Sequence, residues 1–249
     1  MMVNRIQKFL GKKLLGGMEK SPQEAYDLWA SSYDSQPDNL MLALDEEVFS
    51  SLLNNIHLEN KVVVDIGCGT GRHWLKLLNK QPQKIIGFDV SEKMLEKLQH
   101  KIPFAETHQL LSNQLSSLQN NSVDVIVSTL SIAHIKNIEE ALEEWIRVLK
   151  PGGNMIITDY HPTALSMGAD RTFSYDKKTI AIVNYVHSLE KIIAIAEKEK
   201  LQMQIVIQKK IDESMKPYYE KHNAVVVFNR WKDVPIIYGI HFKKADDIK

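Results

Sequence analysis

The feature that most constrains the fold of this chain is a run of mostly β-branched residues, Val62–Ile66, that ends in the glycine-rich segment Gly67–Gly71. A nearly continuous apolar run of this length is typical of a β-strand that is buried on both faces, as in a parallel sheet. Glycines directly after such a strand allow a tight turn and let a ligand approach the backbone amides. The segment therefore predicts a parallel sheet with a ligand site at the carboxyl ends of its strands.

Similar runs recur along the chain, and helical patterns separate them. We predict further strands at 84–89, 105–110, 123–129 and 154–158, and helices at 22–34, 40–57, 71–79, 91–102, 138–149 and 187–200. Two last strands, at 203–211 and 235–242, are expected to form a hairpin at the sheet edge. Strands that alternate with helices indicate βαβ units. The predicted fold is α/β, with a doubly wound, mostly parallel seven-stranded sheet and helices on both faces.

The 249 residues favour one large domain, which we place at 21–245. Residues 161–186 fit no βαβ unit and are interpreted as an insertion near the active site, with a short hairpin around Asp176. Residues 1–20 form a basic extension in which apolar residues recur at helical spacing. Two interpretations of this extension stay open: a membrane-surface or targeting helix, and a frayed or packed helix upstream of a start at Met18.

Composition excludes several classes of protein. Lys and Arg number 31 and Asp and Glu number 31, so the chain lacks the basic excess that is typical of nucleic-acid binding. The single cysteine, Cys68, excludes an internal disulfide, and the chain has no C-x-x-C or H-x-x-x-H pair, so we predict no metal. No apolar run approaches the ~20 residues of a membrane span. We expect a cytoplasmic protein without stable membrane insertion.

The glycine spacing narrows the choice of ligand. Glycine-rich turns after a buried strand serve NAD, FAD, phosphate or S-adenosylmethionine (SAM). A dinucleotide fingerprint has the spacing G-x-G-x-x-G, whereas this loop has G-x-G-x-G and carries Arg72 where the third glycine is expected. Asp89, at the end of the next predicted strand, can accept hydrogen bonds from both hydroxyls of a ribose. These residues indicate a nucleoside-containing cofactor, and the spacing argues against NAD.

Four segments together resemble a known family. VVDIGCGTGR at 63–72, GFDVS at 87–91, RVLKPGG at 147–153 and AYDLWASSYD at 25–34 are similar, in this order, to motifs of class I SAM-dependent methyltransferases of the ubiquinone/menaquinone-biosynthesis type. The resemblance covers about residues 22–160. It implies a Rossmann-like methyltransferase fold with SAM as cofactor.

The resemblance also implies which residues hold SAM. The glycine loop passes the methionine part, Asp65 helps to hold its amino group, Asp89 binds the ribose, and Tyr33 covers the site. The segment after the third strand lies near the adenine, and Ser112 stands where the family usually has an acid. The expected cofactor residues are Tyr33, Asp65, Gly67, Cys68, Gly69, Gly71, Asp89, Val90, Ser112, Asn113, Leu115 and Ser128. Cys68 is expected to be only a small residue in a tight turn, and Leu115 to pack on the adenine face.

The catalytic candidates follow the fourth and fifth strands. His134 is the first choice for a general base, because imidazole titrates near neutral pH, and a structural histidine at a helix start is the alternative. His161 is the second candidate. Tyr26, Asp159, Tyr160 and Tyr185 are predicted to contact the substrate. Tyr26, Trp29 and Tyr33 share one helical face, which equally fits an ordinary core stripe.

The sequence thus favours an enzyme that transfers the methyl group of SAM to O, C or N of a small molecule. Residues 128–131 lack the Asn/Asp-Pro-Pro-aromatic tetrad of enzymes that methylate amino groups of DNA bases. The alternatives are a non-catalytic SAM-binding or regulatory protein and, with less support, an NAD(P)-dependent oxidoreductase. The acceptor stays open, and a monomer and a homodimer are both compatible with the sequence.

Overall fold

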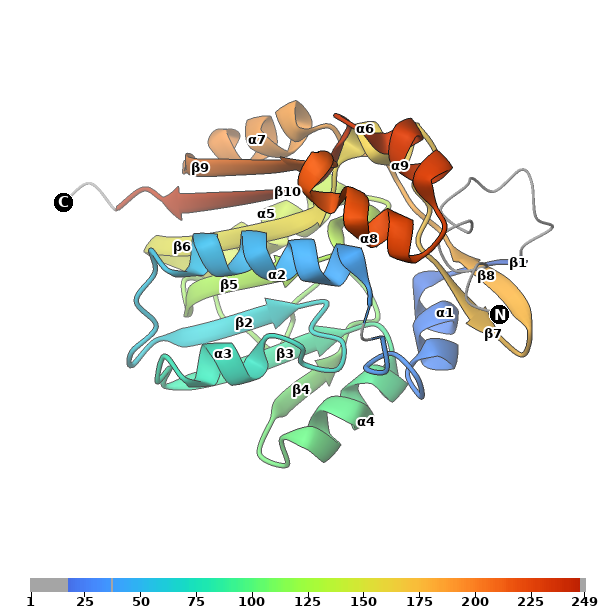
Figure 1. Cartoon of the computed structure of the whole chain (residues 1–249). Coiled ribbons are helices and arrows are strands. Elements are labelled where there is room, and N and C mark those ends of the chain that lie inside the picture. The colour runs from blue at the N-terminus through green and yellow to red at the C-terminus, as the bar shows by residue number, and fades with distance from the viewer. Residues whose placement is uncertain (1–17, 37, 247–249) are drawn as a thin grey trace.

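The computed structural model describes residues 18–36 and 38–246. Within them the chain forms a seven-stranded sheet in the order β4-β3-β2-β5-β6-β10-β9 (Figure 1). The five strands β4, β3, β2, β5 and β6 are parallel to one another. Strand β10 runs antiparallel to both β6 and β9. The predicted fold class and the edge hairpin are therefore confirmed. The predicted amphipathic pattern before Met18 lies outside the described residues.

The strands of this sheet are β2 (Val62–Ile66), β3 (Lys84–Asp89), β4 (Glu106–Gln109), β5 (Val123–Thr129), β6 (Leu149–Tyr160), β9 (Leu201–Lys210) and β10 (Pro235–Lys244). The helices are α1 (Pro22–Trp29), α2 (Leu40–Leu53), α3 (Trp74–Leu78), α4 (Glu92–Lys101), α5 (Ile138–Val148), α6 (Pro162–Ser166), α7 (Leu189–Lys198), α8 (Lys216–Lys221) and α9 (Val225–Trp231). Most helices lie within the predicted ranges and are shorter, because turns fill their ends.

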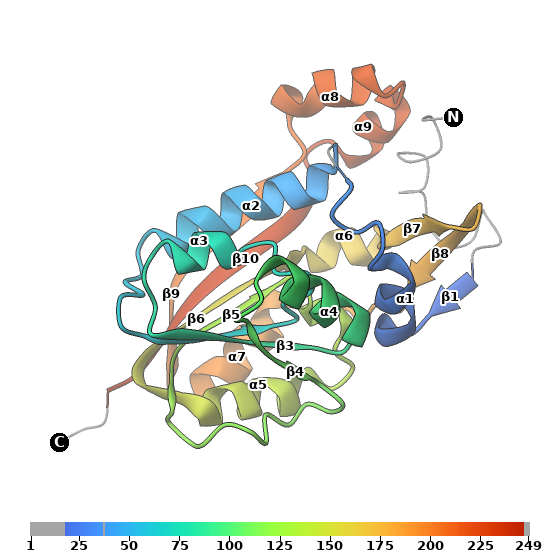
Figure 2. The same cartoon turned by 90° about the horizontal axis from the view of Figure 1, so that it is seen from below.

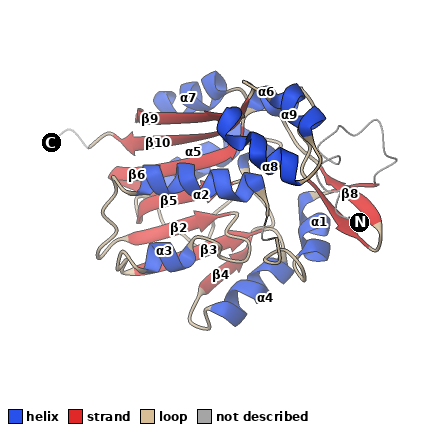
Figure 3. Cartoon of the chain, in the orientation of Figure 1, coloured by secondary structure: helices blue, strands red, loops and turns tan. Residues whose placement is uncertain are grey.

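Helices cover both faces of the sheet, as Figures 2 and 3 show. On one face, α2, α3 and α4 bury an apolar cluster that includes Leu52, Trp74 and Leu98. On the other face, α5 and α7 bury a second cluster around Trp145 and Ile192. Because the central strands are apolar toward both clusters, the sheet is the middle layer of three.

The fifth predicted strand begins earlier than expected. The helix stops before the Pro151-Gly152-Gly153 turn, but Leu149 already pairs with Val123 of β5. The pairing shifts register between Val123 and Val125, so the turn is accommodated as an irregularity inside β6.

Strand β1 and helices α6, α8 and α9 were absent from the sequence prediction. Met18–Lys20 form β1, which pairs in parallel with β8 (Lys178–Ile182), and β8 pairs with β7 (Thr172–Tyr175) in the hairpin predicted around Asp176. The predicted extension therefore contributes its last residues to a small sheet. Helices α8 and α9 lie between β9 and β10 and project from the body in Figure 2. Figure 1 shows α1 and the small sheet beyond the carboxyl ends of the parallel strands.

In the part of the chain that the structure describes, no helix combines the length and hydropathy that a membrane crossing requires.

Candidate active site

The glycine loop after β2 is fixed to the neighbouring strand. The amides of Gly67 and Cys68 donate to the Phe88 carbonyl at 2.7 and 3.0 Å. A Cβ at Gly71 would lie 2.4 Å from Leu98 Cδ1, so this glycine permits close packing of α4. Gly69 differs, because its φ is +53° and a Cβ there would meet no atom within 4 Å. The backbone at Gly69 therefore borders open space, which fits a loop that a ligand approaches closely.

Asp89, at the tip of β3, lies directly beside this loop. Its Oδ2 accepts from the Gly69 amide at 2.8 Å, and its Oδ1 accepts from the Ser91 amide at 2.8 Å. Burial raises the pKa of Asp89 to about 6. The structure thus brings together the two features that the sequence singled out for a nucleoside cofactor. Val90 follows at the strand end, and its carbonyl accepts from the Gln109 amide group.

Asp65, in β2 before the loop, and Cys68, within the loop, are both buried. Asp65 Oδ2 accepts from the Trp74 indole at 2.9 Å, and burial raises the pKa of this carboxyl to about 6. Cys68 Sγ packs against Gly87, where a Cβ would lie 2.8 Å away, and burial raises the pKa of the thiol. This packing agrees with the expectation that Cys68 is a small residue in a tight turn.

Helix α1 lies over the loop side of the sheet. Its Asp27 accepts from the Ser91 hydroxyl at 2.6 Å, and Asp34, just after the helix, accepts from the Thr70 hydroxyl at 2.6 Å. The rings of Tyr26, Trp29 and Tyr33 contact one another. Tyr26 and Trp29 share a face of α1, whereas the helix ends at Trp29 and Tyr33 joins their rings from the turn that follows.

The residues expected near the adenine are spread over different environments. Ser112 is exposed, and Asn113 donates to Glu140 at 3.0 Å. Leu115 is fully buried in the core on the α5 face, and its amide donates to Glu144 at 2.6 Å. The expectation that Leu115 offers its surface to an adenine is corrected for this conformation, because the Glu144 contact turns the residue inward.

Arg171, which sequence reasoning missed, contacts several of the residues predicted to bind the substrate. It is 7% exposed and comes from the insertion, just before β7. Its Nη1 donates to Tyr26 Oη at 2.6 Å, to His134 Nε2 at 2.7 Å and to the Leu130 carbonyl. Its Nη2 lies 3.4 Å from Asp159 Oδ1, and the guanidinium stacks 4.8 Å from the centre of the Tyr160 ring.

His134 is held as a neutral acceptor in this cluster. Its Nδ1 lies 2.9 Å from the Val183 carbonyl, so Nδ1 carries the proton and Nε2 accepts from Arg171. Burial, followed by the positive charge of Arg171, lowers the pKa of His134 to about 3. A group with this pKa is a weak general base at neutral pH. The geometry favours the structural alternative for His134.

The other predicted residues divide between this cluster and its surroundings. Asp159 accepts from the Ala133 amide at 2.8 Å and faces Arg171, and burial raises its pKa. Ser128 contacts the Ser131 hydroxyl at the end of β5. Tyr185 is tied through its backbone amide to the Ala133 carbonyl at 2.7 Å.

His161 has a structural position outside the Arg171 cluster. Its Nδ1 accepts from the Thr163 amide at 3.1 Å, which caps α6, and its Nε2 bonds Gln208 at 2.9 Å. Both ring nitrogens are therefore engaged, and burial lowers the pKa of the ring. As a base, His161 stays an untested prediction that this geometry does not favour.

A second buried network was also missed. Asp45 of α2 is fully buried and accepts from Arg72, from His73 Nε2 at 3.1 Å and from the Thr158 hydroxyl. The signal was present in the sequence, because Asp45 is an acid beside Leu44 and Val48 on the buried stripe of α2. Such a residue needs a buried partner.

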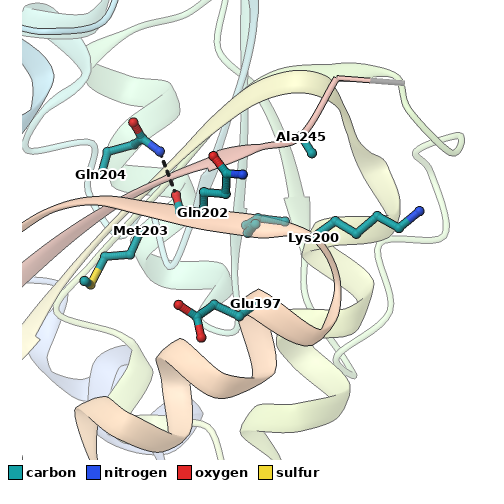
Figure 4. Close-up of a pocket in the computed structure, with 7 residues that line it drawn as sticks. Glu197, Lys200, Gln202, Met203, Gln204 and Ala245 are labelled. Carbon is teal, nitrogen blue, oxygen red and sulfur yellow. Dashed lines mark hydrogen bonds between the residues drawn. The ribbon is translucent and has the colours of Figure 1, made fainter. Parts of the chain in front are cut away.

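Among residues 18–36 and 38–246, no group of three His, Cys, Asp or Glu side chains is arranged to hold a metal ion. A hollow of about 570 Å³ lies at the start of β9, lined by Glu197, Lys200 and Met203 among others (Figure 4). It is on the edge strand and includes none of the predicted site residues.

Comparison with known proteins identifies residues 64–157 as a methyltransferase domain. An uncharacterized protein of Haemophilus influenzae is 31% identical over 58% of this chain and 59% of its own length. A demethylmenaquinone methyltransferase of Bacteroides fragilis is 26% identical over 58% of this chain and 62% of that protein. The matched part thus spans about three fifths of these relatives. A Listeria monocytogenes structure described as a SAM-dependent methyltransferase superposes with a TM-score of 0.62 at 17% identity, covering 82% of this chain and 100% of that one.

Proposed function

We propose that this chain, in which residues 64–157 match a methyltransferase domain, is a SAM-dependent enzyme that transfers the methyl group of SAM to a small molecule at an oxygen, carbon or nitrogen atom. The similarity to SAM-dependent methyltransferases supports this proposal. The observation that carries the proposal is the contact between Gly69, whose backbone borders open space, and Asp89 at the tip of the next strand. A carboxylate at this position is suited to two ribose hydroxyls, and the loop to the methionine part.

SAM supplies a methyl group that is already activated as part of a sulfonium. The protein therefore needs to align the acceptor and exclude water, and alignment of this kind is worth ~7–11 kcal/mol. The aromatic cluster formed by Tyr26 and Trp29 of α1 and by Tyr33 in the turn after it is suited to exclude water from this region. Asp27 of α1 contacts Ser91 after β3, and Asp34 contacts Thr70 of the glycine loop, which supports a reaction space between α1 and the strand ends.

The acceptor site is proposed to include Arg171, Asp159, Tyr26 and Tyr160, at the ends of β5 and β6. Arg171, Asp159 and Tyr160 are buried and Tyr26 is half-buried. Polar groups within an aromatic surround suit a small acceptor with few polar groups. We propose that His134 holds the acceptor side in place as a neutral hydrogen-bond acceptor and does not remove a proton. An acceptor whose proton must leave would then deliver it to another group or to water.

Ligand-dependent thermal stability tests the proposal. SAM and S-adenosylhomocysteine (SAH), at ~100 times their Kd, are expected to stabilise the protein by ~2.7 kcal/mol, and NAD is expected to have no effect. Asp89→Ala should abolish the SAM and SAH shifts, because it removes the ribose acceptor while the fold survives. Asp124→Ala is the matched control, since Asp124 pairs with Lys150 at the opposite end of the sheet. Stabilisation by NAD alone, or undiminished SAH binding by Asp89→Ala, would overturn the proposal.

The alternative of a non-catalytic SAM-binding protein predicts the same binding. It differs in turnover, because no acceptor would release SAH above the background rate. Release of SAH with a panel of phenolic, amine and carboxylic acceptors separates the two functions.

A further inference from the structure

Strand β9 lies at one edge of the seven-stranded sheet. It is ten residues long, and within residues 18–36 and 38–246 no strand pairs with its outer side. An edge strand presents backbone N–H and C=O groups on that side, and a further strand can bind to them. The outer side of β9 is therefore a template for pairing with another chain.

The sequence of β9 does little to protect this edge. Proteins commonly protect an edge with a short strand or with charged side chains. The opposite edge of the sheet follows this rule, because β4 has only four residues and its Glu106 pairs with Lys84. In β9, by contrast, residues 202–208 (QMQIVIQ) carry no charge, and the pairing with β10 is regular from Ile205 to Ile207. The edge is thus long, uncharged and ready to pair.

The charges of β9 favour a second copy in the antiparallel direction. Lys209 and Lys210 both lie at the carboxyl end of the strand. A parallel copy would place these lysines beside the same lysines of its partner, whereas an antiparallel copy keeps them apart. Antiparallel pairing centred on Val206 places Ile205 opposite Ile207 of the second copy. Cross-strand pairs of β-branched residues stabilise a sheet.

The hollow at the start of β9 provides a charge for these lysines. It is lined by Glu197 of α7 and by Gln202 and Met203 of β9, among others. Figure 4 shows the Lys200 side chain extending away from the Glu197 carboxylate. Pairing centred on Val206 places Lys210 of the second copy opposite Gln202, and therefore beside this hollow. The two-fold symmetry of the pair repeats the contact at the other end of the interface.

We propose that β9 pairs in the antiparallel direction with β9 of a second copy of this chain, and that Glu197 of each copy binds Lys210 of the other. The two sheets then form one continuous sheet. Within a single chain these two residues cannot meet, because they flank opposite ends of a strand that spans ~30 Å. The inference is independent of the proposed function.

The test uses sedimentation of the full chain over a series of concentrations. The wild-type protein is expected to form a dimer. Glu197→Lys and Lys210→Glu are each expected to weaken dimerisation by roughly 10-fold, because each places like charges together at two symmetry-related contacts. An equimolar mixture of the two variants should regain the wild-type affinity, since both contacts of the mixed dimer again join opposite charges. Glu220→Lys is the control, because it makes the same change of charge at an exposed position of α8.

Three outcomes would overturn the inference: a wild-type protein that stays monomeric, a dimer that neither variant weakens more than Glu220→Lys does, and a mixture that does not regain affinity. Thermal unfolding reports whether the variants are folded. If one of them is not, the double variant Glu197→Lys/Lys210→Glu decides. It keeps the wild-type net charge and should dimerise with itself, whereas a monomeric double variant would contradict the pairing.

Discussion

At the scale of single residues, the proposed acceptor site is organised around one buried cation, Arg171. It donates to groups from three segments, namely α1, the end of β5 and the end of β6. Removal of one partner from a buried ion pair leaves the other charge uncompensated and typically costs ~3–5 kcal/mol. Arg171→Met is therefore expected to lower the free energy of unfolding by an amount of this order, because Asp159 would lose its cation.

The same substitution has a distinct effect on His134, which NMR of the ring nitrogens can measure. In the wild-type protein His134 is expected to carry its proton on Nδ1 and to stay neutral down to a pH near 3. In Arg171→Met its pKa should rise but remain below 6.5, since burial is the larger cause and Arg171 the second.

The sign of the linkage follows from this pKa. Because the pKa of His134 is lowered on folding, neutral His134 favours the folded state above pH ~6.5, and this contribution is lost as the pH falls toward 3. A His134 signal, assigned with His134→Gln, that titrates near pH 6.5 in the wild-type protein would contradict the buried tautomer described here.

At the scale of elements, the N-cap residue of α4 connects the segment after β3 to helix α1. Ser91 caps α4 by accepting from the Met94 amide at 3.1 Å, and its hydroxyl donates to Asp27 of α1. Ser188 caps α7 in the same way, by accepting from the Lys191 amide at 3.2 Å. Only the first of these caps also holds α1.

Two alanine variants separate these roles. Ser91→Ala and Ser188→Ala are each expected to cost ~1 kcal/mol of unfolding free energy, the usual cost of a lost N-cap. Only Ser91→Ala should also accelerate amide hydrogen exchange in residues 22–29, because it removes the contact to Asp27. Equal exchange in α1 for both variants would show that the Ser91 contact does not hold the helix.

At the scale of the whole molecule, α1 and the small sheet behave as one cap with an apolar cluster of its own. Trp29 stacks on Phe173 with ring centres 4.6 Å apart, and Ile180 and Ile182 pack in the same cluster. Met94 of α4 joins this cluster, which links the cap to the main body. Helix α1 and the small sheet are therefore packed together as one unit against the main body.

The balance of charge over the whole chain leads to a prediction about partners. With a formal net charge of zero, we expect no non-specific binding to bulk tRNA at physiological salt, where basic proteins bind with Kd of roughly 10⁻⁴–10⁻⁶ M. Fluorescence anisotropy with labelled tRNA measures this. Binding that weakens steeply as salt increases would reveal a basic patch and reopen a nucleic-acid substrate.

Local rules were sufficient for the elements that carry the cofactor site. The β-branched run of β2, the cap at Ser91 and the amphipathic α5 are decided by neighbouring residues, so the order of strands and helices was predictable. The placement of Gly69 beside Asp89 followed from the same order, because parallel strands bring their carboxyl ends to one edge.

The acceptor side and the charge networks depended on the tertiary structure. Arg171 and Tyr26 are 145 positions apart in the chain, and Asp45 and Thr158 are 113 apart, so only folding brings each pair together. The residue type does not show whether a charged side chain is buried or exposed, and the partner of a buried charge cannot be inferred from sequence spacing. Strand β1 was missed for the same reason: three residues form a strand here only because β8 offers an edge to pair with. The sequence by itself therefore determined the sheet and the glycine loop, whereas long-range packing decided which polar groups gather around Arg171 in the proposed acceptor site.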